Sequence, residues 1–326
     1  MIAARRWAIP VLMVLVGVLT LLSIIIGRVT LTWDLWTAQD PLTRTILMEL
    51  RLPRALLGVL VGAALGLGGA AMQGYLRNPL AEPATLGVSA MAALGAILSI
   101  FFNIAGLHPW VLPICGVLGG MAGMVALFVF AGAGASVLTL VLSGIILSAL
   151  AVAGISLALS LSPSPWVAGE IVRWMLGSLT DRSFDELAIA TPLIAAGAIA
   201  VLGCSRALDA LTLGETGARS LGIDLNRTQW QLALGIGLMV GASTAVTGMI
   251  GFVGLIVPHL LRPLVGSRPG ALLIPSAVGG AALVLAGDIV VRLLPGGSEL
   301  QLAVIMSLIG APFFFVLLHS MRRKLT

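Results

Sequence analysis

The residue types that carry most covalent chemistry are scarce in this sequence. Its only lysine is Lys324, so the chain contains no GxxxxGK[ST] phosphate-binding loop. The three histidines are far apart, and no pair of Cys or His has the spacing of metal ligands. The run from Gly87 to Ala90 is only weakly similar to an intramembrane serine nucleophile site. We therefore expect no enzyme and no resident metal, and any nucleotide-driven step must come from another polypeptide.

A second group of residues is cationic. Arg51 and Arg54 flank Pro53 and Leu52, and their spacing of three places both guanidinium groups on one face of a helix. Asp288 and Arg292 are four residues apart, a spacing at which the two side chains pair. One interpretation is that these arginines extend to the membrane–water interface. The other is a positively charged rim that docks an acidic soluble partner.

A third group lies in a polar segment between two long apolar runs, residues 205–228. Its sequence LTLGETGARSLGIDL (211–225) predicts short helices broken at Gly214 and near Gly222. Glu215 and Arg219 are four residues apart and share a helical face. Leucines recur through this segment, although a loop that faces only water needs none. The pattern indicates a surface that contacts another protein.

The elements that position these residues are membrane spans. The chain has 326 residues, of which 59% are hydrophobic and 10% charged, a composition that predicts a polytopic membrane protein. Stretches of about 20 apolar residues are long enough to cross the bilayer. We expect ten such helices, near 7–27, 54–74, 84–103, 110–130, 137–160, 187–203, 229–249, 252–265, 271–294 and 300–320.

Charge and repetition indicate how these spans are arranged. If the N-terminus is cytoplasmic, most Arg residues and Lys324 fall on the cytoplasmic side, as the positive-inside rule requires. Both termini and the segment 205–228 are then cytoplasmic, and Arg51 and Arg54 are outside. The triplet at residues 61–63 recurs at residues 240–242, which indicates the inverted repeat typical of transporters. The span centres lack Asp, Glu and Lys, which argues against a proton-driven transporter.

Several motifs, in order, resemble the permease subunits of type II ABC importers for iron chelates, haem and cobalamin. The resemblance covers nearly the whole chain. The motifs are RLPR (51–54), VGAALGLGGAAMQG (61–74), RNPLAEPATLG (77–87), WMLGSL (174–179), LTLGETGARSLG (211–222), GFVGLIVPHLLR (251–262), GDIVVR (287–292) and IGAPFF (309–314). The resemblance implies an all-α, polytopic fold of ten transmembrane helices, the type II ABC importer permease fold, with residues 1–326 forming a single domain.

The resemblance also implies roles for individual residues and partners. The segment 205–228 would couple the permease to a cytoplasmic ATPase, and the coupling residues would be Leu213, Gly214, Glu215, Arg219 and Gly222. Docking of a periplasmic binding protein would use Arg51, Arg54 and Arg292. The translocation pathway would include Ser143, Ser160, Trp174 and Met306, and an inner gate would lie at Ser136 and Thr139.

The implied assembly is a homodimer of permeases in the bacterial inner membrane, with two ABC ATPase subunits and a binding protein. ATP and Mg²⁺ would be bound by the ATPases, so this chain needs no cofactor of its own. Its cargo would be an iron chelate such as a ferric siderophore, with haem or cobalamin as the alternative. A secondary transporter that works without an ATPase is a more distant alternative.

Overall fold

The computed structural model describes residues 2–27, 41–132, 137–294 and 300–322. Within these ranges the regular structure is entirely helical. The helices are α1 (Ile2–Ile25), α3 (Pro41–Thr45), the π-helical η1 (Ile46–Arg51), α4 (Leu52–Leu76), α5 (Val88–Phe101), the 3₁₀ turn η2 (Ala105–Leu107), α6 (Val111–Ala131), α7 (Val137–Ser160), α8 (Pro165–Met175), α9 (Phe184–Gly203), α10 (Ser205–Leu211), α11 (Gly214–Ser220), α12 (Leu225–Thr247), α13 (Val253–Val265), α14 (Pro269–Leu293) and α15 (Leu302–Arg322).

Seven helical segments in the described ranges are long and apolar enough to cross a membrane, and three shorter apolar helices accompany them. The three are α5, α13 and the apolar part of α15. Each of the ten ranges expected from the sequence overlaps one of these helices. The chain is therefore an all-helical, multi-pass membrane protein. Helix α5 is shorter than the sequence indicates, whereas α13 agrees with its expected range to within one residue.

Helices α5 and α13 each begin directly after a residue whose backbone conformation is not helical. Gly87 precedes α5 with φ 83°, and Phe252 precedes α13 with φ 67°, so both lie in the left-handed region. Two prolines, Pro79 and Pro83, also interrupt the segment that joins α4 to α5. The apolar run from residue 84 is thus divided between an irregular connection and a helix of 14 residues.

Helix α4 forms the centre of the bundle, and small residues allow its neighbours to approach its backbone. A Cβ atom added to Gly66 would lie 2.0 Å from the carbonyl oxygen of Ser276 in α14. One added to Gly69 would lie 2.1 Å from the carbonyl oxygen of Gly254 in α13. Such close approach through small residues is expected where the lipid provides no hydrophobic force between helices.

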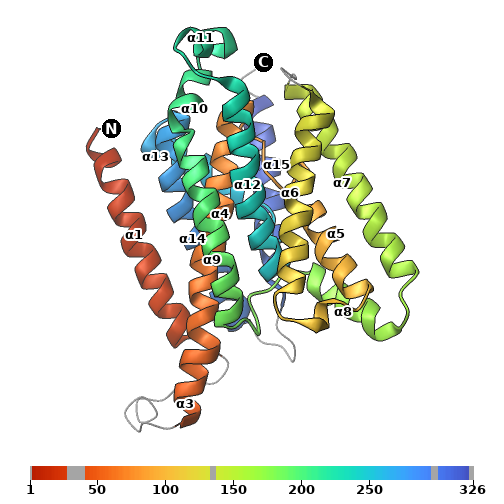
Figure 1. The fold of residues 1–326 in the computed structure, drawn as a ribbon. Coiled ribbons are helices and arrows are strands. Elements are labelled where there is room, and N and C mark those ends of the chain that lie inside the picture. Colours follow the sequence, from red (N-terminus) through yellow and green to blue (C-terminus); the bar gives the residue numbers. More distant parts are fainter. Residues whose placement is uncertain (1, 28–40, 133–136, 295–299, 323–326) are drawn as a thin grey trace.

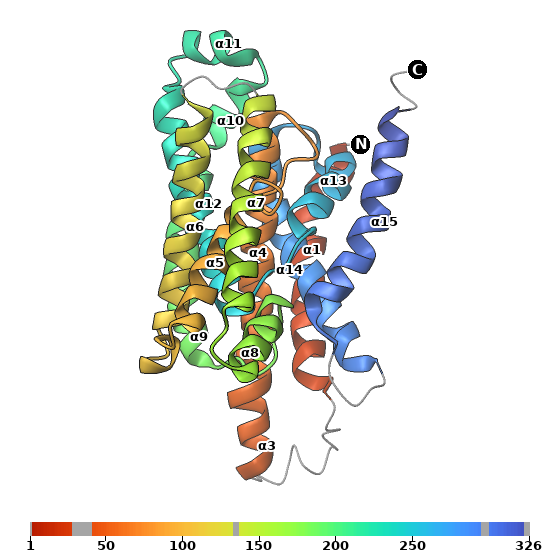
Figure 2. The same cartoon turned by 90° about the vertical axis from the view of Figure 1, so that its right-hand side faces the viewer.

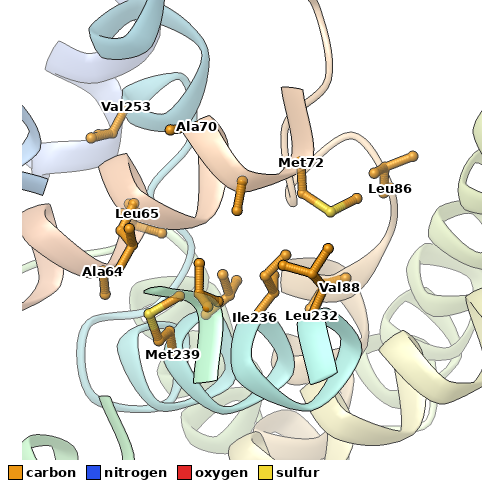
Figure 3. Close-up of a cluster of buried hydrophobic side chains, with 14 of the residues drawn as sticks. Ala64, Leu65, Ala70, Met72, Leu86, Val88, Leu232, Ile236, Met239 and Val253 are labelled. Atoms are coloured by element: carbon orange, nitrogen blue, oxygen red, sulfur yellow. The ribbon is translucent and has the colours of Figure 1, made fainter. Parts of the chain in front are cut away.

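The remaining core is aliphatic. Side chains of α4, such as Leu65 and Met72, meet side chains of α12, such as Ile236 and Met239, as Figure 3 shows. Leu86 and Val88 extend this cluster to the start of α5. The core therefore fixes the connection between α4 and α5 as firmly as the helices themselves.

The chain places its functional candidates at the two ends of the bundle (Figures 1 and 2). Helix α11 caps one end, and the beginning of α1 and the end of α15 lie at that same end. Helix α3 and the first turns of α4 lie at the opposite end, together with the last turns of α1 and α14. We call these the α11 end and the α3 end.

Candidate functional site

At the α11 end, helix α11 begins at Gly214 and ends two residues before Gly222. Both glycines have positive φ, 86° and 79°, so each turn uses a conformation that other residues rarely adopt. This confirms the prediction that the segment breaks at these two glycines. Asp224 then caps α12, since its carboxylate accepts a hydrogen bond from the backbone N–H of Arg227 at 3.0 Å.

The surface of this segment divides into a buried and an exposed face. Leu208 and Leu211 are buried against the bundle, whereas Leu213 and Leu221 are 68% and 62% exposed. A groove of about 470 Å³ lies beside the two exposed leucines. It is lined by Arg206, Asp209, Ala210, Thr212, Leu213, Leu221 and Arg268.

The five expected coupling residues lie together around α11. Glu215, Arg219 and Gly222 are exposed with Leu213, and Gly214 is half-buried. The whole element is held on the bundle by Asp209 of α10. Its carboxylate accepts hydrogen bonds from the Arg268 guanidinium at 2.7 Å and from the backbone N–H of Gly270 at 2.8 Å. These bonds join α10, the helix that precedes α11, to the start of α14.

At the α3 end, the expected docking arginines lie in a single cluster, and all three are buried, with 6–9% of each residue exposed. Arg54 binds the carboxylate of Asp288 through Nε at 3.1 Å and Nη2 at 2.9 Å. Arg292 binds the same carboxylate, so the expected pairing of Asp288 with Arg292 is confirmed. Arg51 donates hydrogen bonds to the carbonyl oxygens of Ile24 and Ile25 at 3.0 and 2.6 Å.

This geometry differs from the rim of exposed charge that the sequence indicates, because the guanidinium groups are directed into the protein. The partners that the sequence did not reveal are the carbonyl groups at the end of α1 and Ser23, which also binds Arg292. No local pattern connects positions separated by more than 200 residues. A docking role for the three arginines stays a prediction.

The four expected pathway residues have different surroundings. Ser143 is buried in α7, and Ser160 is exposed at its end. Trp174 packs with isoleucines of α5, α7 and α8, and Met306 is fully buried with its methyl group against Gly287 of α14. Their pathway role stays a prediction. Of the two expected gate residues, Thr139 is exposed in the first turn of α7, and Ser136 lies outside the described residues.

Glu82, in the connection between α4 and α5, is a buried acidic residue that the sequence analysis did not single out. Its carboxylate accepts hydrogen bonds from the backbone N–H groups of Phe252 and Gly254 at the start of α13. Gln73 of α4 donates to the carbonyl oxygen of Gly254 at 3.1 Å and accepts from Arg262 at 2.7 Å. Glu82 and Gln73 therefore attach both ends of α13 to the first half of the chain.

Burial raises the pKa of Glu82 to about 7 from 4.5, although the two backbone N–H groups act in the opposite direction. The folded protein then binds more protons than the unfolded chain between these two values. Stability is expected to fall as the pH rises through this window, by up to about 1.4 kcal/mol for each pH unit.

The variant Glu82→Gln tests this directly, because glutamine keeps the hydrogen-bond acceptor and does not titrate. Its unfolding midpoint in mixed micelles should be nearly independent of pH between about 5 and 7. The matched control Glu170→Gln, at a half-buried position in α8, should keep the pH dependence of the parent protein. An identical slope for Glu82→Gln and the parent would contradict the assignment.

Among the described residues, no group of three His, Cys, Asp or Glu side chains is placed to hold a metal ion. What the chain does present is a polar, leucine-bearing element at one end of a membrane bundle and a buried ionic cluster at the other. The two features thus lie at opposite ends of a multi-pass helical bundle (Figure 1).

Comparisons with known proteins agree with that arrangement. Residues 13–320 match the model of the FecCD transport family. The chain is 38% identical over 278 residues to the Fe(3+) dicitrate transport system permease protein FecD of Escherichia coli strain K12, covering 85% of this chain and 86% of that protein. It is 34% identical over 319 residues to the hemin transport system permease protein HmuU of Yersinia pestis, covering 96% and 95%.

A solved structure described as an inward-facing conformation of a metal-chelate type ABC transporter shares the fold, with a TM-score of 0.86 and 34% identity. The match covers 96% of this chain and 98% of that chain. Residues, fold and relatives therefore lead to one assignment. The chain belongs to the FecCD transport family and is a permease of an ABC importer of the metal-chelate, haem, vitamin B12 and siderophore type.

Proposed function

We propose that this chain works as a homodimer in the bacterial inner membrane and imports an iron chelate, such as a ferric siderophore, by alternating access. Two cytoplasmic ABC ATPases would bind ATP and Mg²⁺ and act on the α11 ends. A periplasmic binding protein would deliver the cargo at the α3 ends. The chain itself performs no covalent step, and its contribution is the difference in stability between outward-facing and inward-facing states.

The observation that carries this proposal is the exposed surface of α11. A leucine pair, Leu213 and Leu221, flanks Glu215 and Arg219 on an element that is anchored to α14 through Asp209. Exposed leucines beside charged groups form the apolar centre and polar rim that a protein partner requires. The segment 205–228 thus has the features of an ATPase-coupling element.

The proposed topology has ten spans, in which α5, α13 and α15 complete the seven long ones. Both termini are cytoplasmic. Support comes from the excess of Arg at the α11 end and from the position of the beginning of α1 and the end of α15 at that same end (Figure 2). The α3 end is then periplasmic.

The relatives are named for ferric dicitrate, hemin and vitamin B12, and the first of these supports an iron chelate as cargo. The same importer with haem or cobalamin as cargo is the alternative. A deciding experiment measures ATPase activity of the complex in lipid, with its binding protein loaded in turn with ferric siderophore, haem or cobalamin. Stimulation by one loaded form identifies the cargo. If the chain recruits no ATPase, the secondary-transporter alternative is favoured.

The variant Glu215→Arg should uncouple the importer. Reversing this exposed charge disturbs the contact with the ATPase without touching the core, so membrane insertion is unaffected. ATP-driven uptake should fall by about tenfold or more, the effect of losing about 1.4 kcal/mol of coupling free energy. The control Glu49→Arg reverses an exposed charge in η1, the helix that follows α3, and should leave ATPase coupling unchanged. Normal coupling in the Glu215→Arg protein would refute the role given to α11.

A further inference from the structure

The outer end of α1 terminates on the arginine cluster. A helix leaves its last four carbonyl groups without partners inside the helix. Here the carbonyl oxygens of residues 23–26 all accept hydrogen bonds from Arg51 or Arg292. Ser23, which is fully buried, adds its hydroxyl group to Arg292. Two guanidinium groups from distant parts of the chain therefore cap the C-terminus of α1.

The rest of α1 is held by apolar packing, chiefly against α14. Only 11% of its membrane-spanning window is buried inside the protein. An apolar cavity of about 220 Å³ separates part of α1 from α4 and α14. It is lined by Met13, Val16, Val59, Ala63, Ala277, Val278 and Ala281. The polar attachment at the outer end therefore adds to the packing of α1 against α14.

We propose that the arginine cluster is a latch on α1: carboxylates of an acidic docking partner bind Arg51 and Arg292 in place of the α1 carbonyl groups, and docking releases the outer end of α1. This inference rests on the proposed function, which supplies the partner. The exchange is favourable because a carboxylate forms stronger, bidentate hydrogen bonds with a guanidinium group than a neutral carbonyl does. The released carbonyl groups are at the membrane surface, where water can replace the arginines.

Asp288 has a different role, which is to position the arginines. It binds both Arg54 and Arg292, and it is on α14, a different helix from α1. When the outer end of α1 separates from the cluster, Asp288 keeps the guanidinium groups of Arg54 and Arg292 in place for the partner. Asp288 is therefore a positioning residue for docking. By linkage, anything that loosens α1 from the cluster also raises the affinity for the acidic partner.

The test uses the full chain in lipid nanodiscs, with Cys115→Ala and Cys204→Ala removing the native thiols. Ser23→Cys then places a thiol at the buried contact with Arg292. The probe is a hexaglutamate peptide, and the measurement is the rate of labelling by a membrane-impermeant thiol reagent. We expect the peptide to raise this rate at least about tenfold, the change that corresponds to one charge-assisted hydrogen bond. High salt should weaken the effect.

Two matched variants make the result specific. Ser99→Cys places a thiol at another fully buried serine, in α5, whose hydroxyl binds only the local carbonyl of Ala96. Its labelling should not respond to the peptide. Arg292→Lys, which lacks the guanidinium fork, should raise labelling of Ser23→Cys without peptide and reduce the response to peptide.

The outcomes separate the latch from the proposed function. If hexaglutamate binds and labelling of Ser23→Cys stays constant, the latch is overturned and docking by the arginines stands. If hexaglutamate does not bind, the latch is overturned as well. Recruitment of the ATPase, which is measured independently at the α11 end, decides whether the importer assignment stands in either case.

Discussion

Replacing Asp288 with asparagine should lower the free energy of unfolding by about 3–5 kcal/mol, the usual cost of removing one partner from a buried ion pair. The carboxylate is 1% exposed and receives hydrogen bonds from both Arg54 and Arg292. Asparagine leaves two guanidinium groups close together without the negative charge between them. Titration of the purified protein with sodium dodecyl sulfate in mixed micelles, followed by circular dichroism, measures the loss.

A double-mutant cycle shows whether the effect comes from the ion pair. Arg54→Gln removes one of the two cations, so the loss caused by Asp288→Asn should be clearly smaller in that background. The control Asp181→Asn, an exposed aspartate, should change stability by less than about 0.5 kcal/mol. Additive losses, or a single-variant loss below about 1 kcal/mol, would show that Asp288 is not the centre of the cluster.

The sequence predicted those parts of this network that depend on local spacing. Asp288 and Arg292 are one helical turn apart, so their pairing follows from helix geometry alone. The bond from Arg54 to Asp288 joins positions 234 residues apart. Hydropathy and spacing carry no information about such a contact, since it depends on how α4 packs against α14.

The spans were predictable for a similar reason. Hydropathy detects long apolar runs, and the ten expected ranges overlap the seven long and three shorter apolar helices of the described residues. The length of α5 was less predictable, because the left-handed backbone conformation of Gly87 makes this helix begin later than the apolar run does. Helix α8 was not expected to be a separate span, since its 11 residues include Glu170 and Arg173. The burial of Glu82 was not predicted, because a carboxylate between two prolines has the sequence pattern of an ordinary solvent-exposed loop.

The close approach of α4 and α14 leads to the second large effect. Gly66→Ala should lower the free energy of unfolding by about 1–3 kcal/mol, the cost of overfilling a packed interface. The added methyl group would lie 2.0 Å from the carbonyl oxygen of Ser276 and 3.2 Å from the Cα atom of Gly280. Because these are backbone atoms, no side-chain rotation relieves the contact, and the two helices must separate.

A matched glycine separates packing from helix propensity. Gly17 in α1 has no atom within 4 Å of its added methyl position, so Gly17→Ala should be neutral or stabilise the protein by up to about 1 kcal/mol. Equal effects at Gly17 and Gly66 would contradict the packing argument.

The reciprocal variant Gly280→Ala meets the carbonyl oxygen of Gly62 at 2.1 Å across the same interface. One displacement of α14 relieves both contacts, so the double variant Gly66→Ala with Gly280→Ala should lose less stability than the sum of the two single variants. Thermal unfolding of the four proteins in detergent tests this. Strict additivity would mean that the two contacts are relieved by separate local shifts and that α4 and α14 do not move as rigid bodies.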